Sequence, residues 1–287
     1  MICITGANGT VSSEVIRQLE SSGASFRGAY FSGKRAEAAR ARGFEAVIID
    51  YNRPETLRVA FQGCDKVFLL GPNALNQSEL ELNAVEAAKA AGVRHIVKQS
   101  VMGAVEESYS LAKIHRPVEK AIESSGLAWT FLRPNSFMQN VVTFMGKTIR
   151  VESAFYTASD EARISHVDVR DIAAVAVTAL TGVNHEEKAY TVTGPEALTY
   201  DELASELSKA LGRPISHINV SPSDLKSGML AEGVPEAIAA RMLDLERYFR
   251  EGRASHVTHD IRLVTGREPR RLSEYVRETA ATGVWNV

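Results

Sequence analysis

The sequence is poor in cysteine and carries no excess of charge of either sign. Its two cysteines, Cys3 and Cys64, both stand in apolar surroundings, which indicates free thiols in a reducing compartment and excludes a disulfide framework. The 33 basic and 35 acidic residues give a net charge of −2, so no general attraction to nucleic acid or to a membrane surface follows. Neither a signal-peptide segment nor a transmembrane run is recognisable. We therefore expect a cytoplasmic protein that binds neither nucleic acid nor membrane.

The chain also lacks the signatures of two common kinds of catalytic centre. No glycine-flanked serine of a hydrolase nucleophile elbow is present. His256, His259 and Asp260 loosely resemble a set of metal ligands, but no further ligand stands nearby. We expect these three residues to be polar surface groups, and we expect no metal site.

The most informative stretch that the sequence does contain is a glycine-rich turn. The apolar run 2–4 leads into Gly6-x-x-Gly9-x-x-Ser12, and 14–19 is typical of a helix. A strand, a tight glycine turn and a helix present backbone N–H groups and a positive helix end to a nucleotide pyrophosphate. The alternative is a plain strand–helix connection. The residues expected at the pyrophosphate are Gly6, Ala7, Asn8, Gly9, Thr10 and Val11.

The spacing of this turn differs from the G-x-G-x-x-G dinucleotide fingerprint. Gly6 would make the sharp turn off the strand, where φ is positive. Gly9 would let the backbone approach the phosphates, and Ser12 is small enough for the helix to pack closely on the strand. The spacing therefore indicates a variant of the dinucleotide-binding turn.

Strand and helix patterns alternate through the first half of the chain. This alternation predicts an α/β protein with a Rossmann-type doubly wound parallel sheet and a smaller, mostly helical C-terminal substrate domain. We place the nucleotide-binding domain at 1–150, with a strand at 189–193 returning to it, and the substrate-covering domain at 151–287. The expected strands after the first are 25–31, 46–49, 66–70, 95–100 and 129–133, and the expected helices are 34–42, 54–61, 79–91 and 117–125.

The end of the second strand bears on the kind of nucleotide, because ligands of open α/β sheets bind beyond the carboxyl ends of the strands. NAD enzymes usually have an acidic residue there to hold the ribose, and this chain has Phe31 followed by Ser32, Lys34 and Arg35. These donors and positive charges suit a 2′-phosphate. The alternative is a solvated basic helix start, which the helix dipole disfavours. We favour NADP(H) over NAD(H).

Other strand ends supply further candidates for cofactor contacts. Asp50 can cap the next helix, which is the safer interpretation, or accept from an adenine amino group. Leu70, Gly71 and Pro72 would pass close to the nicotinamide-side ribose, and Ser100 would lie beside the nicotinamide. Pro134 opens the segment that would close over that ring.

Three blocks of the sequence resemble the NmrA-like group of atypical short-chain dehydrogenase/reductases. They are 5–9 (TGANG), 125–140 (SGLAWTFLRPNSFMQN) and 166–173 (HVDVRDIA), and 194–200 fits as well. The resemblance runs nearly end to end. It implies a Rossmann domain with NAD(P) in its groove and a small C-terminal domain. Proteins of this group include quinone reductases, triphenylmethane- and azo-dye reductases, iminium reductases and NADP-sensing regulators without turnover.

Two alternatives remain for the proton donor. Tyr109 and Lys113 match the Tyr-x-x-x-Lys spacing of short-chain dehydrogenases, in which the Lys lowers the Tyr pKa and the Tyr passes the proton. In the other register Glu119 matches the Glu of a family Lys-x-x-x-Glu pattern, so that His115 takes the place of the Lys. This register needs no gap before the 125–140 block, and we prefer it. Loss of the Tyr argues against a simple alcohol dehydrogenase.

Apolar residues near the expected nicotinamide position are candidates for substrate contacts. Met102, Phe137, Asn140 and Phe144 could line an apolar pocket, although such a stripe is more often core. We predict an NADPH-dependent oxidoreductase, a monomer or homodimer, that delivers hydride to a small conjugated acceptor such as a quinone, dye, iminium or enone. The alternative is an NADP-sensing regulator without turnover. A third alternative, a sugar-nucleotide epimerase, weakens if the Tyr–Lys pair is out of place.

Overall fold

A computed structural model of the chain describes residues 1–286, which divide into two compact units. The first unit comprises Met1–Ala104, Ala112–Arg133 and Ile172–Tyr190. The second comprises Val105–Leu111, Pro134–Asp171 and the chain from Thr191 onward. The two units do not meet at residue 150, where we expected the domain boundary. The chain leaves the first unit after Arg133 and returns to it at Ile172.

The first unit is built on a parallel sheet. Within residues 1–286 seven strands form this sheet in the order β3-β2-β1-β4-β5-β6-β8. Cys3 of β1 pairs with Arg27 of β2 on one side and with Val67 of β4 on the other. The order reverses between β1 and β4, which is the switch point where such sheets bind ligands. The strands are β1 (Ile2–Ile4), β2 (Phe26–Tyr30), β3 (Glu45–Ile48), β4 (Lys66–Leu69), β5 (His95–Gln99), β6 (Ala128–Pro134) and β8 (Lys188–Val192).

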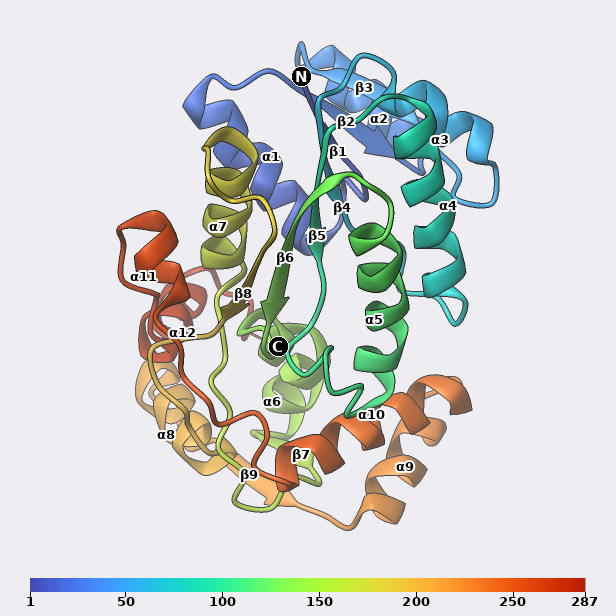
Figure 1. Cartoon of the computed structure of the whole chain (residues 1–287). Helices are drawn as coiled ribbons and strands as arrows, with labels where there is room; N and C mark the ends of the chain where they lie inside the picture. Colours follow the sequence, from blue (N-terminus) through green and yellow to red (C-terminus); the bar gives the residue numbers. More distant parts are fainter. Residues whose placement is uncertain (287) are drawn as a thin grey trace. The chain divides into compact units, whose positions relative to one another are not determined.

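Helices cover both faces of the sheet, as a doubly wound fold requires. Helices α3, α4 and α5 lie on one face, and α1 and α7 lie on the other (Figure 1). The predicted α/β class and Rossmann-type sheet are confirmed. The helices that connect the strands are α1 (Thr10–Ser22), α2 (Gly33–Ala41), α3 (Pro54–Phe61), α4 (Gln77–Ala90), α5 (Ser110–Glu123) and α7 (Val169–Thr181).

The start of α5 differs from the sequence prediction. We expected a helix opened by Pro117, but the helix begins at Ser110 and Pro117 lies inside it. The backbone N–H of Ser110 donates to the Asp244 carboxylate at 2.6 Å, and its hydroxyl donates to the same oxygen at 2.5 Å. A carboxylate at a helix start satisfies N–H groups that the helix itself leaves over. It comes from 134 residues away, so no local pattern could reveal it.

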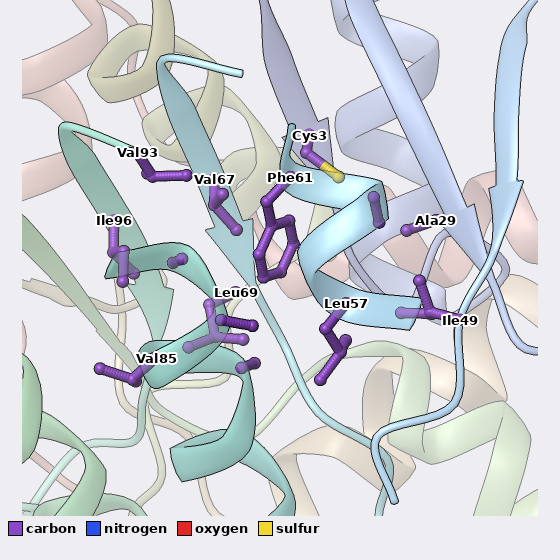
Figure 2. Packing of buried hydrophobic residues seen from close by; sticks show 14 of the residues in the cluster. Cys3, Ala29, Ile49, Leu57, Phe61, Val67, Leu69, Val85, Val93 and Ile96 are labelled. Atoms are coloured by element: carbon purple, nitrogen blue, oxygen red, sulfur yellow. The ribbon is translucent and has the colours of Figure 1, made fainter. Parts of the chain in front are cut away.

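A hydrophobic core fills the space between the sheet and α3 and α4. Phe61 of α3 lies beside Val67 of β4 in this cluster, which also includes Leu57 of α3, Val85 of α4 and Ile96 of β5 (Figure 2). Burying each large apolar side chain contributes about 1.5–3 kcal/mol. This packing fixes the strands whose carboxyl ends carry the candidate cofactor residues.

The second unit contains a small parallel pair of strands and several helices. Ala154 of β7 pairs with Ser216 of β9. A capping box formed by Thr199 and Glu202 opens α8, as their spacing indicates. The elements are η1 (Val141–Met145, a π-helix), α6 (Gly146–Glu152), β7 (Ala154–Thr157), α8 (Tyr200–Leu211), β9 (Ser216–Asn219), α9 (Pro222–Ala231), α10 (Glu236–Arg250), α11 (Asp260–Thr265) and α12 (Leu272–Ala281).

One local prediction in the second unit is wrong. The pattern of residues 163–167 is typical of a short strand, but this segment makes only isolated bridges, Ile164 with Leu198 and Val167 with Phe137. The run 141–152, for which no element was predicted, forms a π-helix followed by α6. Among residues 1–286 no helix is both long and apolar enough to cross a membrane.

Candidate functional site

The glycine turn (residues 6–11) joins β1 to α1 and leaves the helix start bare. Gly6 has a φ of +57°, and a Cβ added there would stand 3.0 Å from the Leu70 carbonyl oxygen. A Cβ on Gly9 would stand 3.1 Å from the Gly6 oxygen. Gly9 is the N-cap of α1 and offers no side-chain hydrogen bond, and the first turn of the helix holds no acidic residue. The N–H groups at this helix start suit an anion such as a pyrophosphate.

Two hydroxyls fix the shape of the glycine turn. The Thr5 hydroxyl accepts from the Leu70 N–H at 2.9 Å and lies 3.0 Å from the Phe68 oxygen. The buried Ser12 hydroxyl donates to the Thr5 carbonyl at 2.8 Å. The small residue expected at position 12 therefore also ties the helix to the strand. Sequence reasoning missed Thr5, although a hydroxyl residue at the end of a buried strand was a signal.

The residues after β2 form a basic, solvent-facing group. Lys34 and Arg35 are exposed at the start of α2, and its first turn holds no acidic residue. The side chain of the N-cap residue, Ser32, makes no capping hydrogen bond. Phe31 is 75% exposed, although aromatic side chains are usually buried at least in part. Exposed cations and an exposed ring at this strand end fit the phosphorylated adenosine end of NADP(H).

Asp50 lies in the turn between β3 and α3. Its carboxylate accepts from the Asn52 N–H at 2.9 Å, while Arg53 is the N-cap of α3. The side chain therefore stabilises the turn before α3. Contrary to our expectation, Asp50 is not the N-cap of this helix.

Residues 70–72 follow β4 and lie at the switch point. The Leu70 oxygen accepts from the Tyr51 hydroxyl at 2.9 Å, and Pro72 is exposed. Gly71 donates its N–H to Oε1 of the buried Glu81 at 2.8 Å, and a Cβ on Gly71 would meet the Glu81 Cγ at 2.6 Å. Only a glycine allows this close approach to the carboxylate.

A charged cluster of Glu81, Lys98 and His115 is buried in the first unit. Glu81 on α4 and Lys98 on β5 are both fully buried, and Lys98 Nζ lies 2.8 Å from Glu81 Oε2. The same Nζ lies 3.1 Å from Nδ1 of His115 on α5, which is 5% exposed. A buried ion pair needs such close partners to offset the cost of removing its charges from water. Sequence reasoning found His115 and missed Glu81 and Lys98.

Glu119 forms a second buried ion pair one turn along α5 from His115. Its carboxylate accepts two hydrogen bonds from Arg133, both at 2.9 Å, and one from Arg116 at 2.9 Å. Burial alone would raise the pKa of Glu119, but the two guanidinium groups hold it below its ordinary value. Glu119 therefore has a structural role: its ion pair with Arg133 ties α5, the helix that carries His115, to the end of β6.

The two residues of the alternative proton-donor pair lie in different surroundings. Tyr109 precedes α5, is buried, and stacks on Tyr248 within the second unit at 4.4 Å between ring centroids. Burial raises the pKa of Tyr109 far above its ordinary value. Lys113 is on α5 and is exposed. A tyrosine that passes a proton needs a lowered pKa, whereas the surroundings of Tyr109 raise its pKa.

The remaining candidates differ in exposure. Ser100 is buried just after β5, where its N–H donates to the Leu132 oxygen at 2.7 Å, and Pro134 is buried at the end of β6. Met102 is 8% exposed and belongs to the core of the first unit.

In the second unit, three candidates for substrate contacts lie on the π-helix η1 or in the residues just before it. Phe137 and Asn140 are half-buried, and Phe144 on η1 is 60% exposed. Asn140 Nδ2 lies 3.4 Å from the Ser136 hydroxyl. Within residues 1–286 no cluster of His, Cys, Asp and Glu has the arrangement of a metal site.

Comparison with known proteins gives matches over nearly the whole chain. The model of the NmrA-like family matches residues 1–277. NAD(P)H azoreductase from Xenophilus azovorans is 36% identical over 282 residues, which cover 98% of each chain. The NADPH-dependent quinone oxidoreductase of Escherichia coli, solved with NADPH, has a TM-score of 0.90 at 27% identity, covering 97% of this chain and 99% of that one.

A third relative is similar over the same length. Triphenylmethane reductase from Citrobacter sp., solved with NADP(H), has a TM-score of 0.87 at 28% identity and covers 97% of this chain and 99% of its own. The glycine turn, the sheet order and these matches agree with the resemblance that the sequence blocks carry. The chain belongs to the NmrA-like family.

Proposed function

We propose that this chain is an NADPH-dependent reductase that delivers hydride to a flat, conjugated small molecule such as a quinone or an azo or triphenylmethane dye. The observation that carries the proposal is the glycine turn. Its N-cap residue, Gly9, makes no side-chain capping hydrogen bond, and a Cβ on either of its two glycines would stand within 3.1 Å of a carbonyl oxygen. The named activities of the relatives, azo and quinone reduction with NAD(P)H, support the acceptor class.

The residues of the first unit divide the binding of NADP(H) among them. The N–H groups at the start of α1, those of Thr10 and Val11, would bind the pyrophosphate, and Lys34 and Arg35 would pair with the 2′-phosphate. Ser32 and Phe31 contact the adenosine end, and Leu70, Gly71 and Pro72 border the nicotinamide-side ribose. When bound, the nicotinamide supplies the hydride, and the protein supplies placement, which accounts for much of the rate.

His115 is our candidate for the proton that accompanies the hydride. Reduction of a quinone to a hydroquinone anion needs one hydride, and a second bond forms when a proton reaches the remaining oxygen. An imidazole N–H can donate to that oxygen as charge develops on it. Tyr109 is less suited to this step because it is buried in an aromatic stack. Phe137, Asn140 and Phe144 remain our candidates for contacts with the acceptor.

Steady-state turnover tests this proposal directly. The purified protein should consume NADPH with a panel of quinones and dyes, and His115→Gln should lower kcat by about 100-fold. His95→Gln is the matched control, because His95 is also buried in the first unit. It lies at the first residue of β5, away from Lys98 near the end of that strand, and its Nε2 lies 2.9 Å from Thr130 Oγ1. Its kcat should stay at the wild-type value. Tight NADPH binding without turnover across the panel would favour a sensing role instead.

A further inference from the structure

Lys98 is unusual because it is a fully buried lysine in the middle of a parallel sheet. Its ammonium group has three acceptors at short range: the Gln99 oxygen at 2.5 Å, Glu81 Oε2 at 2.8 Å and His115 Nδ1 at 3.1 Å. A lysine ammonium has three N–H donors and no acceptor. The contacts with the Gln99 oxygen and with His115 are hydrogen bonds, in which each partner must act as an acceptor, and the contact with Glu81 is an ion pair.

The contact with His115 decides where the imidazole carries its proton. A neutral imidazole has one N–H nitrogen and one acceptor nitrogen. Because the nitrogen that faces an ammonium must accept, Nδ1 is the acceptor and Nε2 carries the hydrogen. The tautomer of His115 is thus determined by Lys98, as the orientation of a catalytic histidine is commonly set by the group on its other nitrogen.

Glu81 has two functions in the charged cluster. Its Oε2 balances the charge of Lys98, and its Oε1 accepts from the Gly71 N–H at 2.8 Å and lies 3.3 Å from Gln77 Nε2. The Oε2 atom also lies 3.9 Å from His115 Nδ1. Without Lys98, this carboxylate would be the nearest charged partner of Nδ1, and it would favour a proton on Nδ1.

We propose that Lys98 and Glu81 are positioning residues that hold His115 with its proton on Nε2, from which it is given to the reduced acceptor. As Nε2 loses that proton, Nδ1 takes one from Lys98 Nζ, 3.1 Å away, so that the imidazole stays neutral and Lys98 becomes a neutral amine. This inference rests on the proposed function of His115. It adds that the lysine acts through the histidine and that the same glutamate anchors the Gly71 backbone beside the cofactor site. The charged cluster therefore joins the proton donor to the loop after β4.

Nitrogen NMR of the wild-type protein tests the tautomer without any variant of Lys98. In protein labelled with 15N-histidine, correlations to the ring protons distinguish an N–H nitrogen from an acceptor nitrogen, and His115 is assigned as the signal missing in His115→Gln. We expect an N–H signal at Nε2 and an acceptor signal at Nδ1 at neutral pH. A proton on Nδ1, or on both nitrogens, would overturn the inference.

Lys98→Met tests the cause of the tautomer, because methionine has a similar length and no donor. We expect the His115 pattern to shift toward a proton on Nδ1 and kcat to fall about tenfold or more, with a smaller change in the KM for NADPH. A wild-type His115 spectrum in Lys98→Met would refute the positioning role. If the wild-type spectrum is as expected but His115→Gln leaves kcat unchanged, the proton role under the proposed function fails, whereas the tautomer assignment stands.

Discussion

The glycine turn and the charged cluster both lie at the carboxyl ends of strands in the first unit, but they are built in opposite ways. The glycine turn works because side chains are missing: a Cβ on Gly6 or Gly9 would stand 3.0 or 3.1 Å from a carbonyl oxygen. The charged cluster works because three long polar side chains fill a space without solvent. The first should therefore fail when atoms are added, and the second when atoms are removed.

The largest effect is expected from removing atoms from the charged cluster. Lys98→Met leaves Glu81 as a buried carboxylate without its ion-pair partner, which should lower the free energy of unfolding by about 3–5 kcal/mol. Urea denaturation followed by circular dichroism measures this loss. The double variant Glu81→Gln with Lys98→Met removes both charges and keeps an acceptor for Gly71, so it should recover most of the loss. If the single and double variants lose the same stability, the ion pair is not the cause.

The next effect comes from adding one carbon to the glycine turn. Gly6→Ala forces a side chain into a left-handed backbone and against the Leu70 oxygen, which should cost about 1–3 kcal/mol of stability and weaken NADPH binding at least tenfold. Calorimetric titration with NADPH measures the affinity.

Gly23→Ala is the control for this variant, because Gly23 has a φ of +71° but nothing within 4 Å of an added Cβ. It should lose a similar amount of stability from the backbone conformation while retaining the wild-type affinity for NADPH. Equal losses of affinity in the two variants would mean that the glycine turn does not bind the cofactor.

A smaller effect is expected at the basic group after β2. Lys34→Ser with Arg35→Ser removes the charges proposed to pair with the 2′-phosphate, so the preference for NADPH over NADH in kcat/KM should fall about tenfold. Arg58→Ser is the control. Arg58 is exposed on α3, so its substitution changes the overall charge without touching the group after β2. An unchanged preference in the double variant would place the 2′-phosphate elsewhere.

The smallest effect is expected at the hydroxyl that ties α1 to β1. Ser12→Ala removes the 2.8 Å hydrogen bond to the Thr5 carbonyl and should cost about 1 kcal/mol, with a several-fold rise in the KM for NADPH. Its neighbour Ser13 is exposed, and its hydroxyl lies 3.3 Å from the Thr10 oxygen. Ser13→Ala should therefore be close to neutral in thermal unfolding, and a loss equal to that of Ser12→Ala would contradict the assigned role.

The comparison also separates what the sequence could predict from what it could not. The requirements of the glycine turn are local, so the identities of Gly6, Gly9 and Ser12 predict its geometry. The charged cluster joins residues from α4, β5 and α5 that no periodicity connects. A lysine within the buried strand His95–Gln99 was a signal for it, since parallel strands buried on both faces are normally apolar. The start of α5 was hidden for the same reason, because Asp244 caps it from a distant helix.

The dipeptide Leu70–Gly71 links the two regions. Leu70 is hydrogen-bonded to the Thr5 hydroxyl beside the glycine turn, and Gly71 is hydrogen-bonded to Glu81 of the charged cluster. A displacement at the phosphate end would therefore be transmitted through a single peptide unit to the carboxylate that balances Lys98. Occupancy of the pyrophosphate position should consequently slow amide hydrogen exchange at Leu70 and Gly71, so that exchange at these two amides reports whether the cofactor is bound, in either oxidation state.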